Sequence, residues 1–163
     1  MVQFANKVIT EEHKVQRQGC ICVSLGTKDK FGIPYNGVVE VGTMQLITPI
    51  PHMPDIVAGI TNWRGKIVTV INTAKLLWNE NESYIGNGKL IFVCNQNILI
   101  AMFVNEVIKS MEYDEKKLDP PLPVRGVIKP DYIAGINDNS ISILNIDTIF
   151  KKIQSDILSW RSV

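Results

Sequence analysis

Residue types that carry out acid–base, nucleophilic or metal chemistry are sparse in this chain of 163 residues, and their spacing does not group them. The histidines, His13 and His52, have no second histidine or carboxylate at a metal-ligand spacing. Cys20 and Cys22 share one face of a predicted strand, and with Cys94 they form an odd set that favours reduced, packed thiols over a zinc site. Neither a phosphate-binding glycine loop nor a nucleophile elbow is present. The sequence therefore predicts no catalysis, no metal and no cofactor.

The most specific chemistry in the sequence is ionic and is centred on a turn at Arg64-Gly65. The simpler interpretation is a hairpin tip with a solvated arginine, because glycine accepts the positive φ of a turn. The alternative is an anchor for carboxylates, because the guanidinium is planar and has several donors. Glu40, the one charge in the apolar stretch 38–41, is the internal candidate. A Glu40–Arg64 pair would fix the turn beside an exposed apolar strip.

The elements that would position this turn belong to a sequence that repeats itself. Residues 54–60 (Pro-Asp-Ile-Val-Ala-Gly-Ile) recur as 130–136 (Pro-Asp-Tyr-Ile-Ala-Gly-Ile). Each copy continues into an apolar alternating run that ends at an asparagine, Asn72 or Asn145. The second copy is three residues shorter and lacks the insert around 62–66 (Asn-Trp-Arg-Gly-Lys). A duplicated scaffold explains what the copies share, so function is expected where they differ.

The duplication extends to an earlier strand, where Glu106 stands as the copy of Glu40. No arginine in that half matches Arg64, which indicates that one half was specialised. The shared glycines, Gly59 and Gly135, suggest a close backbone approach inside a strand. That interpretation is favoured at Gly135, whereas at Gly59, beside the specialised turn, a partner lying close to the backbone is an equal alternative.

Apolar residues near the turn allow two interpretations. Val38, Ile60 and Ile67 suit a core, but small exposed apolar patches are also how binding modules hold partners. Trp63 could likewise be a core residue or a contact, and the sequence does not decide.

Short apolar runs separated by turns, arranged as two repeats, predict an all-β fold of two small barrels that share a hydrophobic core. Each half of about 70 residues would be marginal alone. We expect a mobile lead-in over 1–18, one domain over 19–152 with interleaved halves of roughly 19–78 and 89–145, and a C-terminal helix and tail over 146–163. Predicted strands cover 20–25, 31–41, 45–48, 57–62, 67–71, 90–94, 98–103 and 141–145, and predicted helices cover 73–78 and 146–160.

Composition narrows the classes of function. Hydrophobic residues make up 45% and charged residues 20%, which is typical of a globular chain. A formal net charge of +1 argues against nucleic-acid binding through a strong positive field. The N-terminus has no signal-peptide pattern, and no apolar run is long enough to insert into a membrane, so we expect a cytoplasmic protein.

These features resemble the CheW family of chemotaxis coupling proteins over roughly residues 19–152. The resemblance is carried by Phe31-Gly32-Ile33, Val38-Val39-Glu40-Val41, Ile47-Thr48-Pro49-Ile50-Pro51 and the long run from Val57 to Asn72, and in the second half by 104–107, 132–136 and 141–145. It implies two five-stranded SH3-like β-barrels, no catalysis, and an adaptor that joins the regulatory domain of the CheA histidine kinase to the cytoplasmic tip of methyl-accepting chemoreceptors. It also implies recruitment of this cytoplasmic protein to membrane-associated receptor arrays.

The resemblance assigns roles to individual positions. Glu40 and Arg64 match charged positions beside the receptor groove, Val38 and Gly59 match positions implicated in kinase or receptor coupling, and Asn62 and Gly65 belong to the signature turn. With Ile60, the candidate partner-binding set is Val38, Glu40, Gly59, Ile60, Asn62, Arg64 and Gly65.

The chain departs from the family pattern in two places. Trp63 stands where an aliphatic residue is commoner, and Asn105 stands where an aspartate is usual. Two alternative functions stay open. One is a pathway-specific paralogue that binds the kinase without coupling receptors, and the other is an SH3-like double barrel that binds a small ligand or nucleic acid.

Overall fold

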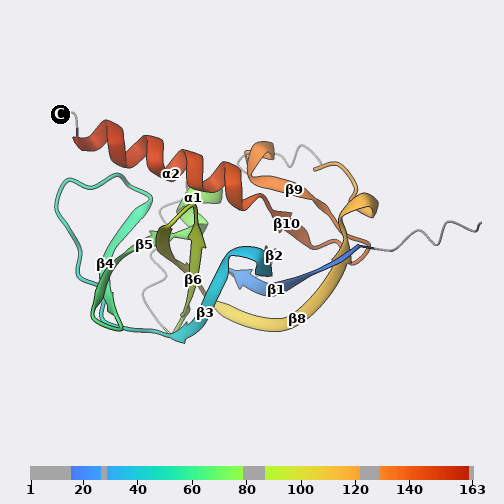
Figure 1. Ribbon diagram of the computed structural model, residues 1–163, viewed down its shortest axis with the longest axis horizontal. Coiled ribbons are helices and arrows are strands. Elements are labelled where there is room, and N and C mark those ends of the chain that lie inside the picture. Colours follow the sequence, from blue (N-terminus) through green and yellow to red (C-terminus); the bar gives the residue numbers. More distant parts are fainter. Residues whose placement is uncertain (1–15, 27–28, 79–86, 122–128, 162–163) are drawn as a thin grey trace, which may run out of the picture.

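Ten strands form two five-stranded sheets in the computed structural model, which describes residues 16–26, 29–78, 87–121 and 129–161. Sheet 1 has the order β3-β6-β7-β5-β4, with β3 (Val38–Thr43), β4 (Val57–Trp63), β5 (Lys66–Asn72), β6 (Lys89–Asn95) and β7 (Ile98–Val104). Sheet 2 has the order β8-β1-β2-β10-β9, with β1 (Arg17–Leu25), β2 (Asp29–Pro34), β8 (Glu106–Asp114), β9 (Ile133–Ile136) and β10 (Ser142–Leu144). The sheets lie side by side, and the long helix α2 (Ile146–Arg161) starts after β10, where the sheets meet, and extends along sheet 1 (Figure 1). The mainly β, two-subdomain fold is confirmed.

The two sheets do not coincide with the two sequence repeats. Sheet 2 combines β1 and β2 from the first repeat with β8, β9 and β10 from the second, and sheet 1 combines β3, β4 and β5 with β6 and β7. Two parallel strand pairs, β10 with β2 and β5 with β7, join strands of different repeats within each sheet. The ranges 19–78 and 89–145 are therefore sequence repeats rather than separate barrels. Each repeat gives its first hairpin to the other, so neither half contains a complete sheet.

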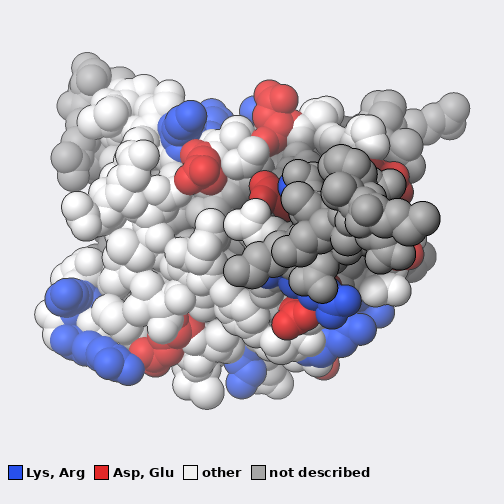
Figure 2. All heavy atoms as spheres, turned by 45° about the vertical axis from the view of Figure 1, so that its right-hand side comes forward, with Lys and Arg blue, Asp and Glu red and all other residues white. Residues whose placement is uncertain are grey.

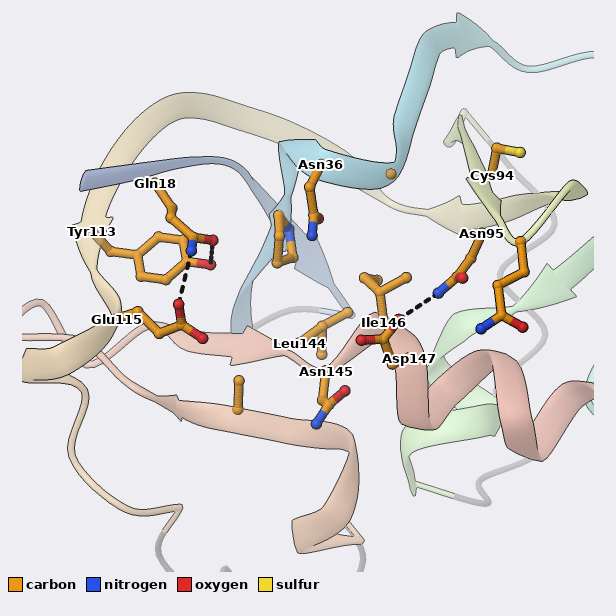
Figure 3. A pocket seen from close by; sticks show the side chains of 14 residues that line it. Gln18, Asn36, Cys94, Asn95, Tyr113, Glu115, Leu144, Asn145, Ile146 and Asp147 are labelled. Carbon is orange, nitrogen blue, oxygen red and sulfur yellow. Dashed lines mark hydrogen bonds between the residues drawn. The ribbon is translucent and has the colours of Figure 1, made fainter. Parts of the chain in front are cut away.

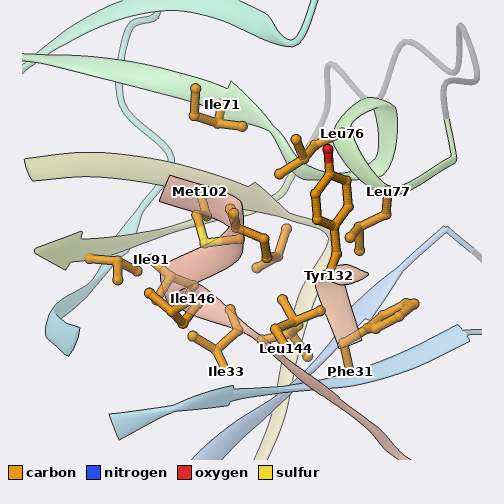
Figure 4. Packing of buried hydrophobic residues seen from close by; sticks show 14 of the residues in the cluster. Phe31, Ile33, Ile71, Leu76, Leu77, Ile91, Met102, Tyr132, Leu144 and Ile146 are labelled. Carbon is orange, nitrogen blue, oxygen red and sulfur yellow. The ribbon is translucent and has the colours of Figure 1, made fainter. Parts of the chain in front are cut away.

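One hydrophobic cluster joins the two sheets, as the shared core predicted from the sequence requires (Figure 4). It contains Phe31 and Leu144 from sheet 2, Ile71 and Met102 from sheet 1, and Ile149 from α2. Each sheet also curls around a smaller cluster of its own, on Phe92 and its neighbours in sheet 1 and on Cys20 and its neighbours in sheet 2. Because most apolar burial is shared, the two sheets stabilise each other.

The asparagines that end each repeated run begin the two α-helices. The Asn72 side chain accepts a hydrogen bond from the Lys75 amide at 3.0 Å and starts α1 (Thr73–Trp78). The Asn145 side chain accepts one from the Thr148 amide at 3.1 Å and starts α2. Asparagine is favoured at this position because its oxygen satisfies an amide of the first turn. Both helices were predicted from the sequence, and α2 buries Ile146, Ile149, Phe150 and Ile153 on one face.

Three local predictions need correction. The strand expected over 31–41 is broken by a short 3₁₀ turn, η1 (Tyr35–Gly37), which carries the chain from sheet 2 to sheet 1. The segment 45–48 is not a strand, because only Thr48 bridges to Ile60. The lead-in ends earlier than expected, since β1 begins at Arg17. Residues 1–15 of that lead-in and the connector 79–86 lie outside the described residues.

Within the described residues no helix combines the length and the apolar character needed to cross a membrane.

Candidate functional site

The β4–β5 turn has the backbone geometry of a tight two-residue hairpin. Arg64 and Gly65 both have positive φ, 51° and 81°, which is the pattern whose twist matches flanking antiparallel strands. The Asn62 side chain accepts a hydrogen bond from the Gly65 amide at 2.9 Å and holds the turn from within. A Cβ on Gly65 would meet nothing within 4 Å, so glycine is needed there for its φ rather than for space. The turn therefore presents Arg64 on a defined, narrow tip.

The ion pair predicted between Glu40 and Arg64 is present. Arg64 Nη2 lies 2.6 Å from Glu40 Oε2, and the same oxygen accepts a hydrogen bond from Trp63 Nε1 at 3.2 Å. The Arg64 side chain remains 72% exposed, whereas that of Glu40 is 32% exposed. The carboxylate is thus held from two sides while most of the guanidinium faces solvent.

These contacts join the two outer strands of sheet 1. Glu40 lies on β3 and Trp63 on β4, which are the first and last strands in the sheet order. The Trp63 ring stacks on Phe92 of β6, with centroids 5.3 Å apart and planes 27° apart, inside the small core of sheet 1. The sheet edges do not pair as a ladder here, so these side chains bring them together. Trp63 is accordingly both a core residue and a surface contact.

An isolated backbone bridge, called a latch below, joins a neighbouring segment to the outer strand of each sheet. In sheet 1 Thr48 and Ile60 exchange hydrogen bonds of 2.8 and 2.9 Å, and in sheet 2 Asp119 and Ile136 exchange two of 2.9 Å. The repeated glycines make room for these bridges. A Cβ on Gly59 would lie 2.4 Å from the Thr48 carbonyl oxygen, and one on Gly135 would lie 2.6 Å from Leu118 Cβ. Both glycines therefore serve a close backbone approach within the chain.

This geometry corrects one expectation about Gly59. From the sequence, Gly59→Asp would be expected to weaken partner binding with little effect on the melting temperature. Gly59 is instead buried, has a φ of 148°, and faces the backbone of Thr48. Any side chain there must displace the latch, so the substitution is expected to destabilise the fold.

The apolar candidates divide between the core and the surface. Val38 is half-buried and packs against the shared core, and Ile60 is half-buried behind the Thr48 latch. Ile67 is 67% exposed, so the core interpretation of that residue was wrong. Val39 and Val41, which the sequence did not single out, are also exposed on β3. The half of the molecule that carries Arg64 therefore shows apolar side chains as well as charges.

Within the part of the chain that the structure describes, Cys20 and Cys22 are buried thiols in the core of sheet 2. Burial, followed by the neighbouring Cys22, raises the pKa of the Cys20 thiol to about 11, and burial also raises the pKa of Cys22. Thiols with raised pKa values are poor nucleophiles and poor metal ligands. Among the described residues no three His, Cys, Asp or Glu side chains come together in a way that could hold a metal ion. His13 lies outside the described residues.

A cleft of about 390 Å³ lies where the two sheets meet the start of α2 (Figure 3). At one end Tyr113 donates to Gln18, and Gln18 donates to Glu115. At the other end Asn95 donates to Asp147 at 2.7 Å. Its lining residues come from both sheets and from α2: Gln18, Pro34, Asn36, Gly37, Cys94, Asn95, Gln96, Tyr113, Glu115, Ala134, Leu144, Asn145, Ile146 and Asp147.

Sequence reasoning missed this cleft, and none of the seven candidate residues lines it. Its lining contains acidic and amide side chains but no lysine or arginine. The nearest signal in the sequence is asparagine at positions 36, 95 and 145. These asparagines are most simply interpreted as residues of turns and helix caps, so they do not indicate a cleft. The lining residues come from six separate stretches of the chain (18, 34–37, 94–96, 113–115, 134 and 144–147), so they leave no local pattern.

Charged side chains are distributed unevenly over the surface. Figure 2 shows a group of lysine and arginine side chains at the lower left, next to acidic atoms, and a second basic group at the lower right. In the β4–β5 turn, Arg64 and Lys66 are both exposed. Mixed charges beside exposed apolar residues are typical of a protein-binding surface.

Two intimately packed five-stranded β-sheets with a charged hairpin tip define a mainly β fold of two subdomains. Comparison with known proteins gives the family: residues 19–154 match the model of the CheW-like domain, and the chain belongs to the CheW-like family of chemotaxis scaffold proteins. It is 24% identical over 127 residues to protein FrzA of Myxococcus xanthus, covering 75% of this chain and 79% of that protein. It is 25% identical over 134 residues to chemotaxis protein CheW of Treponema pallidum, covering 78% of each.

Solved structures agree with this assignment. The fold is similar to that of the scaffolding protein TtCheW from Thermoanaerobacter tengcongensis, with a TM-score of 0.71 and 27% sequence identity. The match covers 85% of this chain and 91% of that one. The family resemblance drawn from the motifs is thereby confirmed across nearly all of both chains.

Proposed function

We propose that this chain is a non-catalytic adaptor that couples methyl-accepting chemoreceptors to a CheA-type histidine kinase. Its partners are the regulatory domain of the kinase and the cytoplasmic tip of the receptors, and it works in membrane-associated receptor arrays. Membership of a chemotaxis scaffold family supports this role. Holding two partners on one small protein raises the effective concentration of each for the other.

The observation that carries the proposal is the one-sided β4–β5 turn. The Glu40–Arg64 pair occurs in sheet 1. Glu106, the copy of Glu40 in the second repeat, has no side-chain partner among the described residues. A feature needed for folding alone would be expected in both copies. The candidate contacts are Val38, Glu40, Gly59, Ile60, Asn62, Arg64 and Gly65, of which Gly59 acts by holding the Thr48 latch rather than by touching a partner.

In the proposed mechanism the two partners use different surfaces. The apolar strand edges of one sheet hold the kinase regulatory domain, and the surface around Arg64 holds the receptor tip through an apolar contact with a polar rim. Ile67 supplies exposed apolar area, and Arg64 and Lys66 supply the rim. Rim charges of this kind act mainly on association rate and specificity.

Calorimetry tests the proposal directly. Wild-type protein is titrated with the isolated regulatory domain of a chemotaxis kinase from the same organism, and separately with a soluble receptor-tip fragment. Binding at micromolar or tighter affinity to both supports an adaptor. Arg64→Ala is expected to weaken binding to the receptor fragment, whereas Arg17→Ala, which removes an exposed arginine from its ion pair with Glu112 in sheet 2, serves as the matched control.

The other outcomes identify the alternatives. Binding to the kinase domain without binding to the receptor fragment would indicate a pathway-specific paralogue. Binding to neither by a folded protein would contradict the proposal, and a salt titration against single-stranded DNA would then test the nucleic-acid alternative.

A further inference from the structure

Trp63 contacts both charged groups of the ion pair, the Glu40 carboxylate and the Arg64 guanidinium. Its indole Nε1 donates to Glu40 at 3.2 Å, and the guanidinium carbon of Arg64 lies 5.1 Å from the centre of its ring. The inner side of the ring is fixed by the stack on Phe92. The indole therefore connects the core of sheet 1 to both members of the surface pair.

Such a connection changes what a surface ion pair can do. An exposed pair contributes little because two long side chains must be held in one geometry against their conformational freedom. A ring face beneath the guanidinium and an N–H group beside the carboxylate restrict both side chains through cation–π attraction and a charge-assisted hydrogen bond. The pair is thus already ordered before any partner arrives.

The ordered arginine still has donors to offer. Arg64 uses Nη2 on Glu40, a guanidinium has five N–H donors, and the side chain is 72% exposed. The segment 62–67 contains Arg64 and Lys66 but no acidic residue, and it ends at the exposed Ile67. Charge complementarity therefore favours a protein surface that presents a carboxylate beside an apolar side chain.

We propose that Trp63 is a positioning residue that sets partner specificity by holding Glu40 and Arg64 as one preformed element, whose outward donors receive a carboxylate of the protein partner. The proposal rests on the proposed function for the existence of that partner. It goes beyond that function by assigning the positioning of the ion pair to an indole that the core of sheet 1 holds in place. Preorganisation of this kind improves affinity by reducing the ordering cost of binding.

The first experiment needs no partner. In ¹⁵N-labelled protein, the indole N–H resonance of Trp63, assigned with Trp63→Phe, is compared between the wild type and Glu40→Gln. It is expected to shift in Glu40→Gln, because the substitution replaces the charged acceptor of the indole N–H by a neutral amide. An indole resonance that does not change with the substitution would overturn the proposal. The resonance of Trp78, whose ring packs edge-on against Phe31 5.3 Å away, is the internal control.

The second experiment measures binding to the receptor-tip fragment and the kinase domain with two graded variants. Trp63→Phe keeps a ring for Phe92 and Arg64 but removes the N–H donor, and Trp63→Leu removes both. We expect about three- to tenfold weaker binding of one partner by the phenylalanine variant, the range of one lost hydrogen bond, and a larger loss with leucine. Trp78→Phe is expected to bind as wild type does.

The outcomes separate Trp63 from the adaptor role itself. If the wild type binds and both Trp63 variants bind with the same affinity, the positioning role is overturned and the adaptor role is not affected. Losses that follow the melting temperatures of the variants, rather than the missing donor, would also overturn it. Absence of binding by the wild type would contradict the adaptor role, and the indole resonance of Glu40→Gln would then decide on Trp63 alone.

Discussion

The β4–β5 hairpin and its duplicate, the β9–β10 pair, show which parts of a repeated motif were kept for folding. Both lie at the end of a sheet, and both contain a glycine over which a neighbouring segment crosses. Their tips differ. The first has strands of seven residues and a turn that reaches Glu40 on another strand, whereas the second has strands of four and three residues.

The polar groups of the second tip form hydrogen bonds within the turn and none to another strand. The buried side chain of Asn137 accepts hydrogen bonds from the amides of Asn139 and Ile141, and the positive φ falls on Ser140. Its polar groups are used within the turn. The comparison indicates that the latch is a folding device, because it is present in both copies. An ion pair between the hairpin tip and another strand is present at the first tip, and the described residues of the second tip make none.

The latch is where substitutions are expected to have the largest effect. Gly59→Ala combines a positive φ with a steric conflict against the Thr48 backbone, so we expect a loss of about 2–5 kcal/mol in the free energy of unfolding. Gly135→Ala meets Leu118 and Asp119 without a positive φ, so a smaller loss of about 1–3 kcal/mol is expected from overpacking alone. Urea denaturation of both variants measures the difference.

A control for the glycine experiment is Gly65→Asn, on the same hairpin in open space. Asparagine tolerates positive φ, so its melting temperature should stay near that of the wild type. Equal stability of Gly59→Ala and the wild type would contradict the latch and would return Gly59 to the list of direct partner contacts.

Much of this fold was predictable, because local pattern and final structure agree. The repeat, the helix at 73–78, the helix from Ile146 and the Glu40–Arg64 pair follow from periodicity, capping residues and the isolation of one charge in an apolar strand. The hairpin exchange was not predictable in this way. Both sheets use strands of similar composition, and the choice between partners is made by the shared core, which no single segment encodes.

The candidate site was predictable for its charges and not for its supporting contacts. Arg64 and Glu40 stand out by type, but the role of Trp63 depends on Phe92, a residue 29 positions away on another strand. The same holds for the Thr48 latch, where a single bridge was mistaken for a strand at 45–48. Contacts between distant segments explain both errors.

Alkaline pH is expected to destabilise sheet 2 more than sheet 1. Burial raises the pKa of Cys20 from 9.0 to about 11 and that of Tyr113 from 10.0 to about 12. Both groups are neutral when protonated, so their contribution is complete below the unfolded-state pKa and is lost as the pH rises toward the folded-state values. Unfolding free energy should therefore fall from about pH 9, the ordinary value for cysteine, to about pH 12, the folded-state value of Tyr113. Unfolding curves at stepwise pH measure this.

Thiol labelling supplies the matching local measurement. At pH 8 an alkylating reagent is expected to modify the half-buried Cys94 of sheet 1 well before the fully buried Cys20 and Cys22 of sheet 2. Rapid labelling of all three in the native protein would contradict the burial of the sheet 2 core.

The two helix caps offer a smaller and more even comparison. Asn72→Ala and Asn145→Ala each remove one side-chain acceptor from the first turn of a helix, and each is expected to lower the free energy of unfolding by about 1 kcal/mol. Thermal unfolding of the two variants should give similar shifts, because the repeated asparagine does the same work in both copies. A cap that matters in only one copy would show that the duplication had diverged there too.

The smallest effect on stability, and the sharpest contrast in function, is expected at the charges themselves. Arg64→Ala and Glu106→Ala remove exposed side chains, so each should change the free energy of unfolding by about 0.5 kcal/mol or less. Only Arg64→Ala is expected to weaken partner binding, and the weakening should shrink as salt is raised, because salt screens exposed charges. Calorimetry at low and high salt makes the comparison. Equal losses of binding in the two variants would mean that the partner responds to the overall surface charge, and this would contradict a specific contact at the β4–β5 turn.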